Sequence, residues 1–148
     1  MTHEHWMREA ITLAQEAMAA GEVPVGCVIV DREGNILGRG RNRREADKSA
    51  AAHAEILAIE AACRAVGDWR LSDLTLYVTL EPCPMCAGAI INARIGKVFY
   101  GARDSNLGAC GSVLNLFMEG FGHSPQLTGG LLEEECGALL TTFFKNLR

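Results

Sequence analysis

The feature that most constrains this chain is Cys83-Pro84-Met85-Cys86, where two thiols stand three positions apart just after an apolar stretch, residues 74–80. Pro84 suits the first position of a helix, because its φ is fixed and its missing N–H has no intrahelical partner there. The pattern therefore predicts Cys83 at the start of a helix and Cys86 in its first turn. The positive end of the helix dipole favours the thiolates that a soft metal requires.

Two cysteines fill only half of a zinc site, which takes about four ligands. His53-Ala54-Glu55 lies at the head of another apolar helical pattern, residues 56–66, and His53 is the predicted third ligand. Three protein ligands leave one position open for water, which distinguishes a catalytic zinc from a closed structural one. Glu55 is the predicted proton carrier. A spacing of two puts these side chains on opposite sides of an ideal helix, so we expect the metal at the helix end.

The 148 residues, 49% of them hydrophobic, are enough for one domain, residues 1–148, with a sizeable core. The continuous β-branched run at 25–30 predicts a central strand buried on both faces, joined by a turn at 31–35 to an antiparallel partner. Strand, helix and strand alternate after residue 74, which is typical of the α/β class. Helices are predicted at 5–18, 56–66, 84–93, 112–118 and 131–146, and strands at 25–30, 36–40, 74–80, 97–101 and 126–128.

Neither an export signal nor a long apolar run is present, so we expect a cytoplasmic protein with no membrane partner. The six cysteines are then expected to be reduced, because the chain is too long and core-rich for a disulfide-stapled domain. Cys27, Cys63 and Cys136 are predicted to act as small hydrophobes, as free cysteines usually do. Cys110 has the same prediction, but its glycine-rich surroundings also make it the candidate for a fourth thiolate.

The net charge of −4 does not indicate a nucleic-acid-binding protein, which normally shows a basic excess. Basic residues nevertheless gather just upstream of His53, at Arg39, Arg41, Arg43, Arg44 and Lys48. A local basic rim can steer a phosphate backbone even on an acidic protein. An ordinary solvated face explains the same charges equally well.

The order His-x-Glu followed by Pro-Cys-x-x-Cys resembles the motif of the zinc-dependent deaminases. The resemblance is closest to the bacterial tRNA-specific adenosine deaminases and covers nearly the whole chain. It is carried by residues 21–26, 42–43, 52–56, 76–83, 85–89, 101–104 and 143–145. One departure is Ser49-Ala50-Ala51, where the family commonly has Asp-Pro-Thr.

The resemblance implies a three-layer α/β/α fold with a mixed five-stranded sheet, and a homodimer. It implies one Zn²⁺ per subunit, held by His53, Cys83 and Cys86, with Glu55 moving the proton. The implied reaction is hydrolysis of adenosine to inosine at the wobble position of a tRNA anticodon loop, with release of ammonia.

The resemblance also implies substrate contacts. Asn42 is expected to hydrogen-bond the flipped base, the backbone around Ala54 to polarise the reacting centre, and Phe144, Lys145 and Arg148 to touch the RNA. An amide side chain pairs well with the edge of adenine, although capping a turn explains Asn42 as well. Proteins read single-stranded RNA loops by stacking and edge contacts, so a tRNA anticodon stem-loop is the expected partner.

Two other interpretations remain open on the sequence. One is a deaminase of a free nucleobase or nucleoside, of the guanine or cytosine type; the basic segment and Phe144-Lys145 favour RNA instead. The other is a non-enzymatic module in which Cys110 closes the zinc site. Binding to RNA that weakens steeply with salt would favour the RNA-editing enzyme over a deaminase of free bases. Loss of turnover in Glu55→Ala, with zinc retained, would favour an enzyme over a non-enzymatic module.

Overall fold

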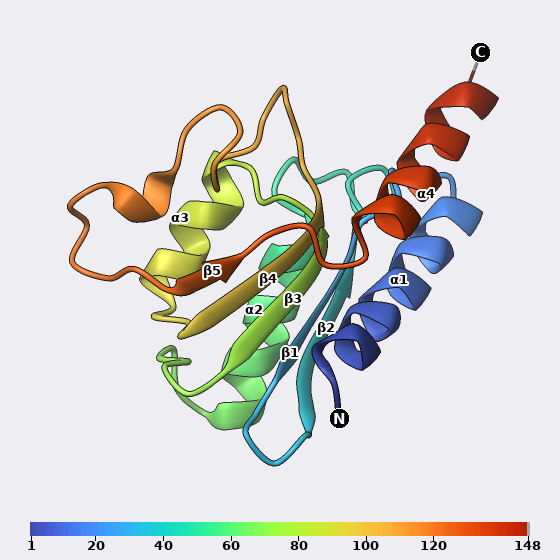
Figure 1. The fold of residues 1–148 in the computed structure, drawn as a ribbon. Coiled ribbons are helices and arrows are strands. Elements are labelled where there is room, and N and C mark those ends of the chain that lie inside the picture. Colours follow the sequence, from blue (N-terminus) through green and yellow to red (C-terminus); the bar gives the residue numbers. More distant parts are fainter. Residues whose placement is uncertain (148) are drawn as a thin grey trace.

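Five strands form one mixed sheet in the computed structural model, which describes residues 1–147 (Figure 1). Arg148, an expected RNA contact, lies outside the described residues. The strand order is β2-β1-β3-β4-β5, with β1 antiparallel to both neighbours and β4 parallel to β3 and β5. The strands are β1 (Gly26–Val30), β2 (Ile36–Arg41), β3 (Thr75–Leu80), β4 (Lys97–Ala102) and β5 (Gln126–Thr128).

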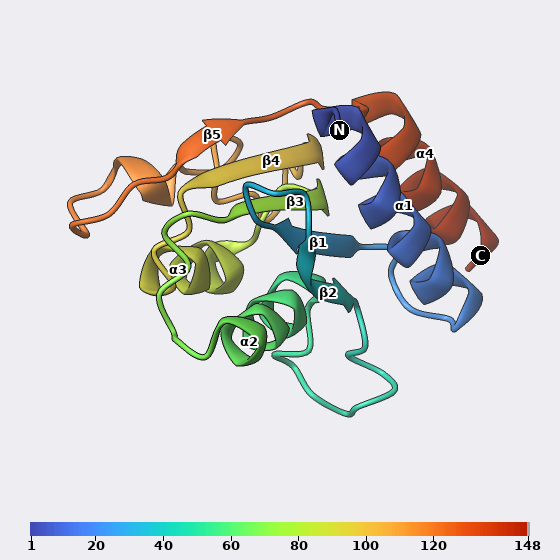
Figure 2. The same ribbon diagram turned by 90° about the horizontal axis from the view of Figure 1, so that it is seen from below.

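Helices cover both faces of this sheet, as Figure 2 shows. On one face lie α1 (His3–Ala19) and α4 (Glu133–Asn146), and on the other lie α2 (Ala54–Val66) and α3 (Pro84–Asn92). The predicted α/β class, with three layers and five strands, is therefore confirmed. None of the helices among the described residues is both long enough and apolar enough to cross a bilayer.

Strand β1 lies in the middle of the core, because every one of its residues is buried. Cys27 and Ile29 pack with the side chains of α2 and α3, whereas Val28 and Val30 pack with those of α1. This alternation gives each face of the strand its own apolar cluster, and it confirms the prediction of a strand buried on both faces.

Helix α2 lies directly against the backbone of edge strand β2. A Cβ atom on Gly40 would stand 2.1 Å from the carbonyl oxygen of Ala54, and one on Gly38 would stand 2.2 Å from that of Ala58. Such distances are far inside van der Waals contact, so only glycine permits this approach. The contact fixes where α2 begins, and α2 begins at the functional site.

The helix predicted at 112–118 was wrong in extent, because only the 3₁₀ turn Leu116–Met118 is helical. Upstream of it the chain reverses tightly: the N–H of Gly111 donates to the carbonyl of Leu114, with Gly111 at φ 132°. Asn115 then caps the 3₁₀ turn through its side-chain oxygen, which accepts from the N–H of Phe117 at 3.1 Å.

Candidate metal and catalytic site

The two helices that cover the same face of the sheet begin at His53 and Cys83, which are the N-cap residues of α2 and α3. Both have extended backbone, and neither side chain makes a capping hydrogen bond to its helix. Each is therefore free to point across the gap between the helix ends. Cys86, in the first turn of α3, is buried beside them. Pro84 at the first position of α3 accounts for the sharp start of that helix.

These three side chains converge. The Nδ1 atom of His53 lies 3.7 Å from Sγ of Cys83 and 3.6 Å from Sγ of Cys86. Ordinary zinc–sulfur and zinc–nitrogen bonds at a tetrahedral angle put ligand nitrogen and sulfur about 3.6 Å apart. The donor set and its spacing therefore fit one zinc ion. Within residues 1–147 they form the single group of three or more potential ligands close enough together to share a metal.

The contact between the two cysteines shifts their pKa values in opposite directions. A hydrogen bond from Cys86 lowers the pKa of Cys83 to about 4, and the same contact raises the pKa of Cys86. The hydrogen bond with Cys83 raises the pKa of His53. A divalent cation among these atoms removes the penalty for ionising both thiols, because it supplies the positive charge that the site lacks.

Glu55 lies in the first turn of α2, with 4% of its surface exposed, and it lines the same cavity as His53 and Cys83. Burial raises the pKa of its carboxyl to about 7. A carboxyl in this setting can both accept and return a proton. The candidate ligand His53 and the candidate proton carrier Glu55 thus lie at one helix end, as the sequence analysis expects.

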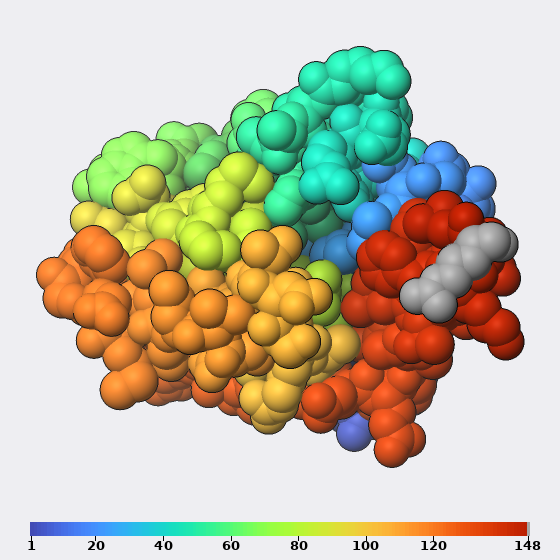
Figure 3. Space-filling model, turned by 90° about the horizontal axis from the view of Figure 1, so that it is seen from above, coloured from blue at the N-terminus to red at the C-terminus, as the bar shows by residue number. Residues whose placement is uncertain are grey.

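The site opens into a cavity of about 390 Å³, within the size range of small-molecule sites. Its wall comes from the chain segment at 42–44, from the loop at 103–107 and from α4. Figure 3 shows these segments meeting on one face of the molecule, coloured teal, amber and red. The cavity is therefore assembled from segments far apart in the sequence.

The residues expected to contact substrate lie in or near this cavity. Asn42, Ala54 and Phe144 line it, whereas Lys145 is exposed on α4 and does not. Asn42 is 7% exposed, and its Oδ1 accepts a hydrogen bond from the N–H of Arg44 at 3.1 Å. Asn42 therefore caps a turn and also faces the cavity, so the two interpretations of this residue are compatible.

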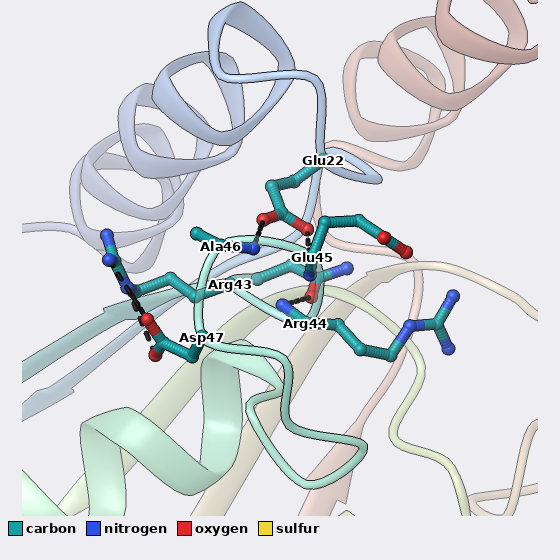
Figure 4. A network of polar contacts seen from close by, with 7 residues as sticks. Glu22, Arg43, Arg44, Glu45, Ala46 and Asp47 are labelled. Atoms are coloured by element: carbon teal, nitrogen blue, oxygen red, sulfur yellow. Dashed lines mark hydrogen bonds and ion pairs between the residues drawn. The ribbon is translucent and has the colours of Figure 1, made fainter.

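Glu22 anchors the segment that carries Asn42 and Arg44 (Figure 4). Its carboxylate is 2% exposed and accepts hydrogen bonds from the N–H groups of Glu45, at 3.0 Å, and Ala46, at 2.8 Å. This role could not be predicted from the sequence, because a glutamate before Val-Pro carries no local signal of a partner 23 residues away.

Several other residues of the cavity were not predicted as site residues. Arg103, Asp104 and Leu107 line it from the loop after β4, and Glu81 lines it from the end of β3. Cys110 lies outside the metal-ligand group of the described residues, and burial raises the pKa of its thiol to about 12. The geometry thus gives no support to a zinc site closed by Cys110.

Comparison with known proteins gives consistent matches. The family described as the cytidine and deoxycytidylate deaminase zinc-binding region matches residues 1–102. A tRNA-specific adenosine deaminase of Bacillus subtilis is 50% identical over 146 residues, which cover 98% of this chain and 90% of that protein. The tRNA-specific adenosine deaminase of Haemophilus influenzae is 45% identical, covering 98% and 84%.

Solved structures match over nearly the whole chain as well. One, from a study of A-to-I editing by tRNA:A34 deaminases at the wobble position of transfer RNA, has a TM-score of 0.88 and 42% identity. The match covers 92% of this chain and 99% of that one. A guanine deaminase from Nitrosomonas europaea has a TM-score of 0.86 at 26% identity, covering 96% and 84%.

Proposed function

Because the chain belongs to the cytidine and deoxycytidylate deaminase family, we propose that it is a zinc-dependent enzyme that converts adenosine to inosine in RNA. The substrate is the wobble adenosine of a tRNA anticodon loop, and the second product is ammonia. The observation that carries this proposal is the convergence of His53, Cys83 and Cys86 beside buried Glu55, in a chain 50% identical to a tRNA-specific adenosine deaminase.

His53, Cys83 and Cys86 would hold one Zn²⁺ per subunit, which supplies a Lewis acid that makes water nucleophilic at neutral pH. Glu55 accepts a proton from the attacking water and gives it to the adjacent ring nitrogen, N1 of adenine. Glu55 then assists protonation of the departing amino group. The water oxygen becomes bonded to C6, the C6–N6 bond breaks, and the products are inosine and ammonia.

The cavity wall positions the base for this step. The side-chain amide of Asn42 hydrogen-bonds the edge of the purine, and the backbone at the start of α2, at Ala54, faces the reacting carbon. Leu107, 61% exposed, and Phe144, 48% exposed, offer apolar surface for stacking at the mouth. Lys145, one position beyond Phe144 on α4, is suited to a nearby phosphate.

Cations at the cavity favour an RNA substrate over a free base. Arg44 and Arg103 both line the cavity, although the chain as a whole has a net charge of −4. Arg103 is paired with Glu133 at 3.7 Å and donates to the hydroxyl of Tyr100 at 3.0 Å, so Arg44 is the cation that carries the argument. A phosphate backbone explains a basic residue at this position, whereas a neutral purine base does not. The similarity to a guanine deaminase, at 26% identity, supports the alternative function, which is deamination of a free nucleobase.

The test compares substrates directly. The purified zinc-loaded protein is incubated with an anticodon stem-loop that has adenosine at the wobble position, and separately with adenosine, guanine and cytidine. We expect inosine and ammonia from the stem-loop, with binding that weakens steeply as salt rises. Turnover of guanine or cytidine without turnover of the stem-loop would refute the proposal.

Glu55→Gln is the matched test of the mechanism. It keeps the size of the side chain but removes the proton carrier, so we expect turnover to fall about 100-fold or more while zinc stays bound. Full turnover by a zinc-loaded Glu55→Gln protein would show that another group moves the proton.

The proposal includes a homodimer in the cytoplasm, where tRNA and reduced thiols occur together. Exposed apolar side chains support a protein partner: Met85 on α3, and Val113, Leu114, Met118 and Phe121 around the 3₁₀ turn that α3 contacts. Analytical ultracentrifugation tests this, because Met118→Asp should then shift the protein from dimer to monomer.

A further inference from the structure

We propose that Glu81 is a positioning residue, whose carboxylate holds residues 104–112, here called the cavity loop, in the conformation that forms one wall of the cavity. The inference rests on the proposed function for its kinetic consequence. It does not make Glu81 a catalytic residue, because the side chain is directed to the cavity loop rather than to the reacting atoms.

Every hydrogen bond to the Glu81 carboxylate comes from the cavity loop. Oε1 accepts from the N–H of Asp104 at 3.1 Å and from the hydroxyl of Ser112. Oε2 accepts from the N–H groups of Cys110 and Ser112, each at 3.0 Å. Because all four partners are donors, the site matches an acceptor with two oxygens, which an ionised carboxylate is and an amide is not.

The loop is wrapped tightly around this carboxylate. A Cβ atom on Gly108 would stand 2.4 Å from both Cδ and Oε2 of Glu81, so a side chain cannot be placed there without moving one of them. Glu81 itself is 1% exposed. A desolvated carboxylate that lost these donors would be costly, so the loop and the carboxylate stabilise each other.

The end of the cavity loop that begins at Asp104 is the part that lines the cavity. At this end of the loop the N–H of Asp104 donates to Glu81, and the carboxylate of Asp104 accepts from the N–H groups of Asn106, at 3.0 Å, and Leu107, at 3.1 Å. Those three residues line the cavity. Glu81 therefore sets the position of Leu107 and Asn106 through Asp104, while its own carboxylate oxygens are occupied by donors of the cavity loop.

The backbone of Glu81 has a separate role, which does not depend on its side chain. Its backbone N–H donates to the carbonyl of Ala102 at 2.8 Å, which continues the pairing of β3 with β4. A substitution of the side chain leaves this backbone hydrogen bond intact, so the chain segment between β3 and Cys83 should keep its position. A side-chain substitution should therefore release the cavity loop while leaving the metal ligands together.

The test is Glu81→Gln in the zinc-loaded protein, measured on the anticodon stem-loop. We expect KM to rise about 10-fold, the effect of one lost hydrogen bond to a charged acceptor, while kcat changes by less than about threefold. Zinc stoichiometry should be unchanged. Amide hydrogen exchange of residues 104–112 should accelerate, and this readout needs no substrate.

Asp31→Asn is the matched control, because Asp31 also organises a loop by accepting backbone N–H groups, from Glu33 at 3.0 Å and Asn35 at 2.8 Å, in the β1–β2 hairpin. It does not line the cavity. Its KM should equal that of the wild type. An equal rise of KM in both variants would mean that general destabilisation is responsible, and the proposal would be wrong.

Ser112→Ala is a second, milder variant that tests the same proposal if Glu81→Gln does not fold. Ser112 is exposed, and its replacement removes one donor and leaves the carboxylate in place. We expect a smaller rise of KM and faster exchange of the same amides. Unchanged exchange and unchanged KM, or a loss of zinc that accounts for the loss of activity, overturns the proposal. If the wild type does not act on the stem-loop, the proposed function fails, and the exchange readout still decides the role of Glu81.

Discussion

Replacing Gly40 by alanine should damage the metal site from a distance. Gly40 is on β2 and is not itself a predicted ligand. The new Cβ would stand 2.1 Å from the carbonyl oxygen of Ala54 and 2.8 Å from the N–H nitrogen of Ala58. Ala54 lies between His53 and Glu55, so any retreat of α2 moves both functional side chains.

The size of the movement follows from the contact. Since Cβ atoms are essentially never found closer than 3.0 Å to such a neighbour, the start of α2 must shift by about 0.9 Å. Metal–ligand bonds tolerate only about ±0.2 Å. We therefore expect zinc affinity to fall roughly 10- to 100-fold, as it does when the support of a ligand is lost. Overpacking of this kind also costs about 1–3 kcal/mol of stability.

Competition with a zinc chelator measures the affinity, and thermal unfolding of the metal-free protein measures the stability separately. Gly137→Ala in α4 is the matched control, because nothing lies within 4 Å of a Cβ atom there. It should bind zinc normally and be slightly more stable, by about 0.5–1 kcal/mol. If Gly40→Ala binds zinc as tightly as Gly137→Ala, the contact between β2 and α2 does not position His53, and the reasoning is refuted.

Two further outcomes are expected. Cys110→Ala should retain one zinc per chain by elemental analysis, since Cys110 lies outside the described ligand group; loss of the metal would restore the closed-site interpretation. Asp31→Asn should be less stable than the wild type near pH 7, and this difference should shrink as the pH falls below the ordinary carboxyl pKa. Hydrogen bonds from the backbone and side chain of Asn35 lower the pKa of Asp31. The stability from its ionised form is therefore present above the ordinary carboxyl pKa and is lost as pH falls through the lower folded value. Unfolding temperatures measured from neutral to acid pH test this, and a difference that does not shrink in acid would contradict it.

The local sequence determined the parts of the site that depend on neighbouring residues alone. Pro84 is suited to the first position of a helix, so the placement of Cys83 and Cys86 at a helix N-terminus could be predicted from the sequence Cys-Pro-Met-Cys. The apolar run of β1 likewise required burial on both faces. His53 was predicted as the third ligand because two cysteines fill only half of a zinc site, and the motif resemblance implied the same ligand.

Only the tertiary structure decided which residues hold the cavity in shape. Glu22 and Glu81 look in the sequence like ordinary surface carboxylates, yet each is buried and accepts N–H groups from a loop at least 23 residues away. Apart from the hydroxyl of Ser112, their partners are backbone N–H groups, which every residue except proline carries and which leave no trace in the amino-acid pattern. The sequence therefore determined the chemical groups of the site, and the folded chain determined their support, because a buried carboxylate is defined by the donors around it.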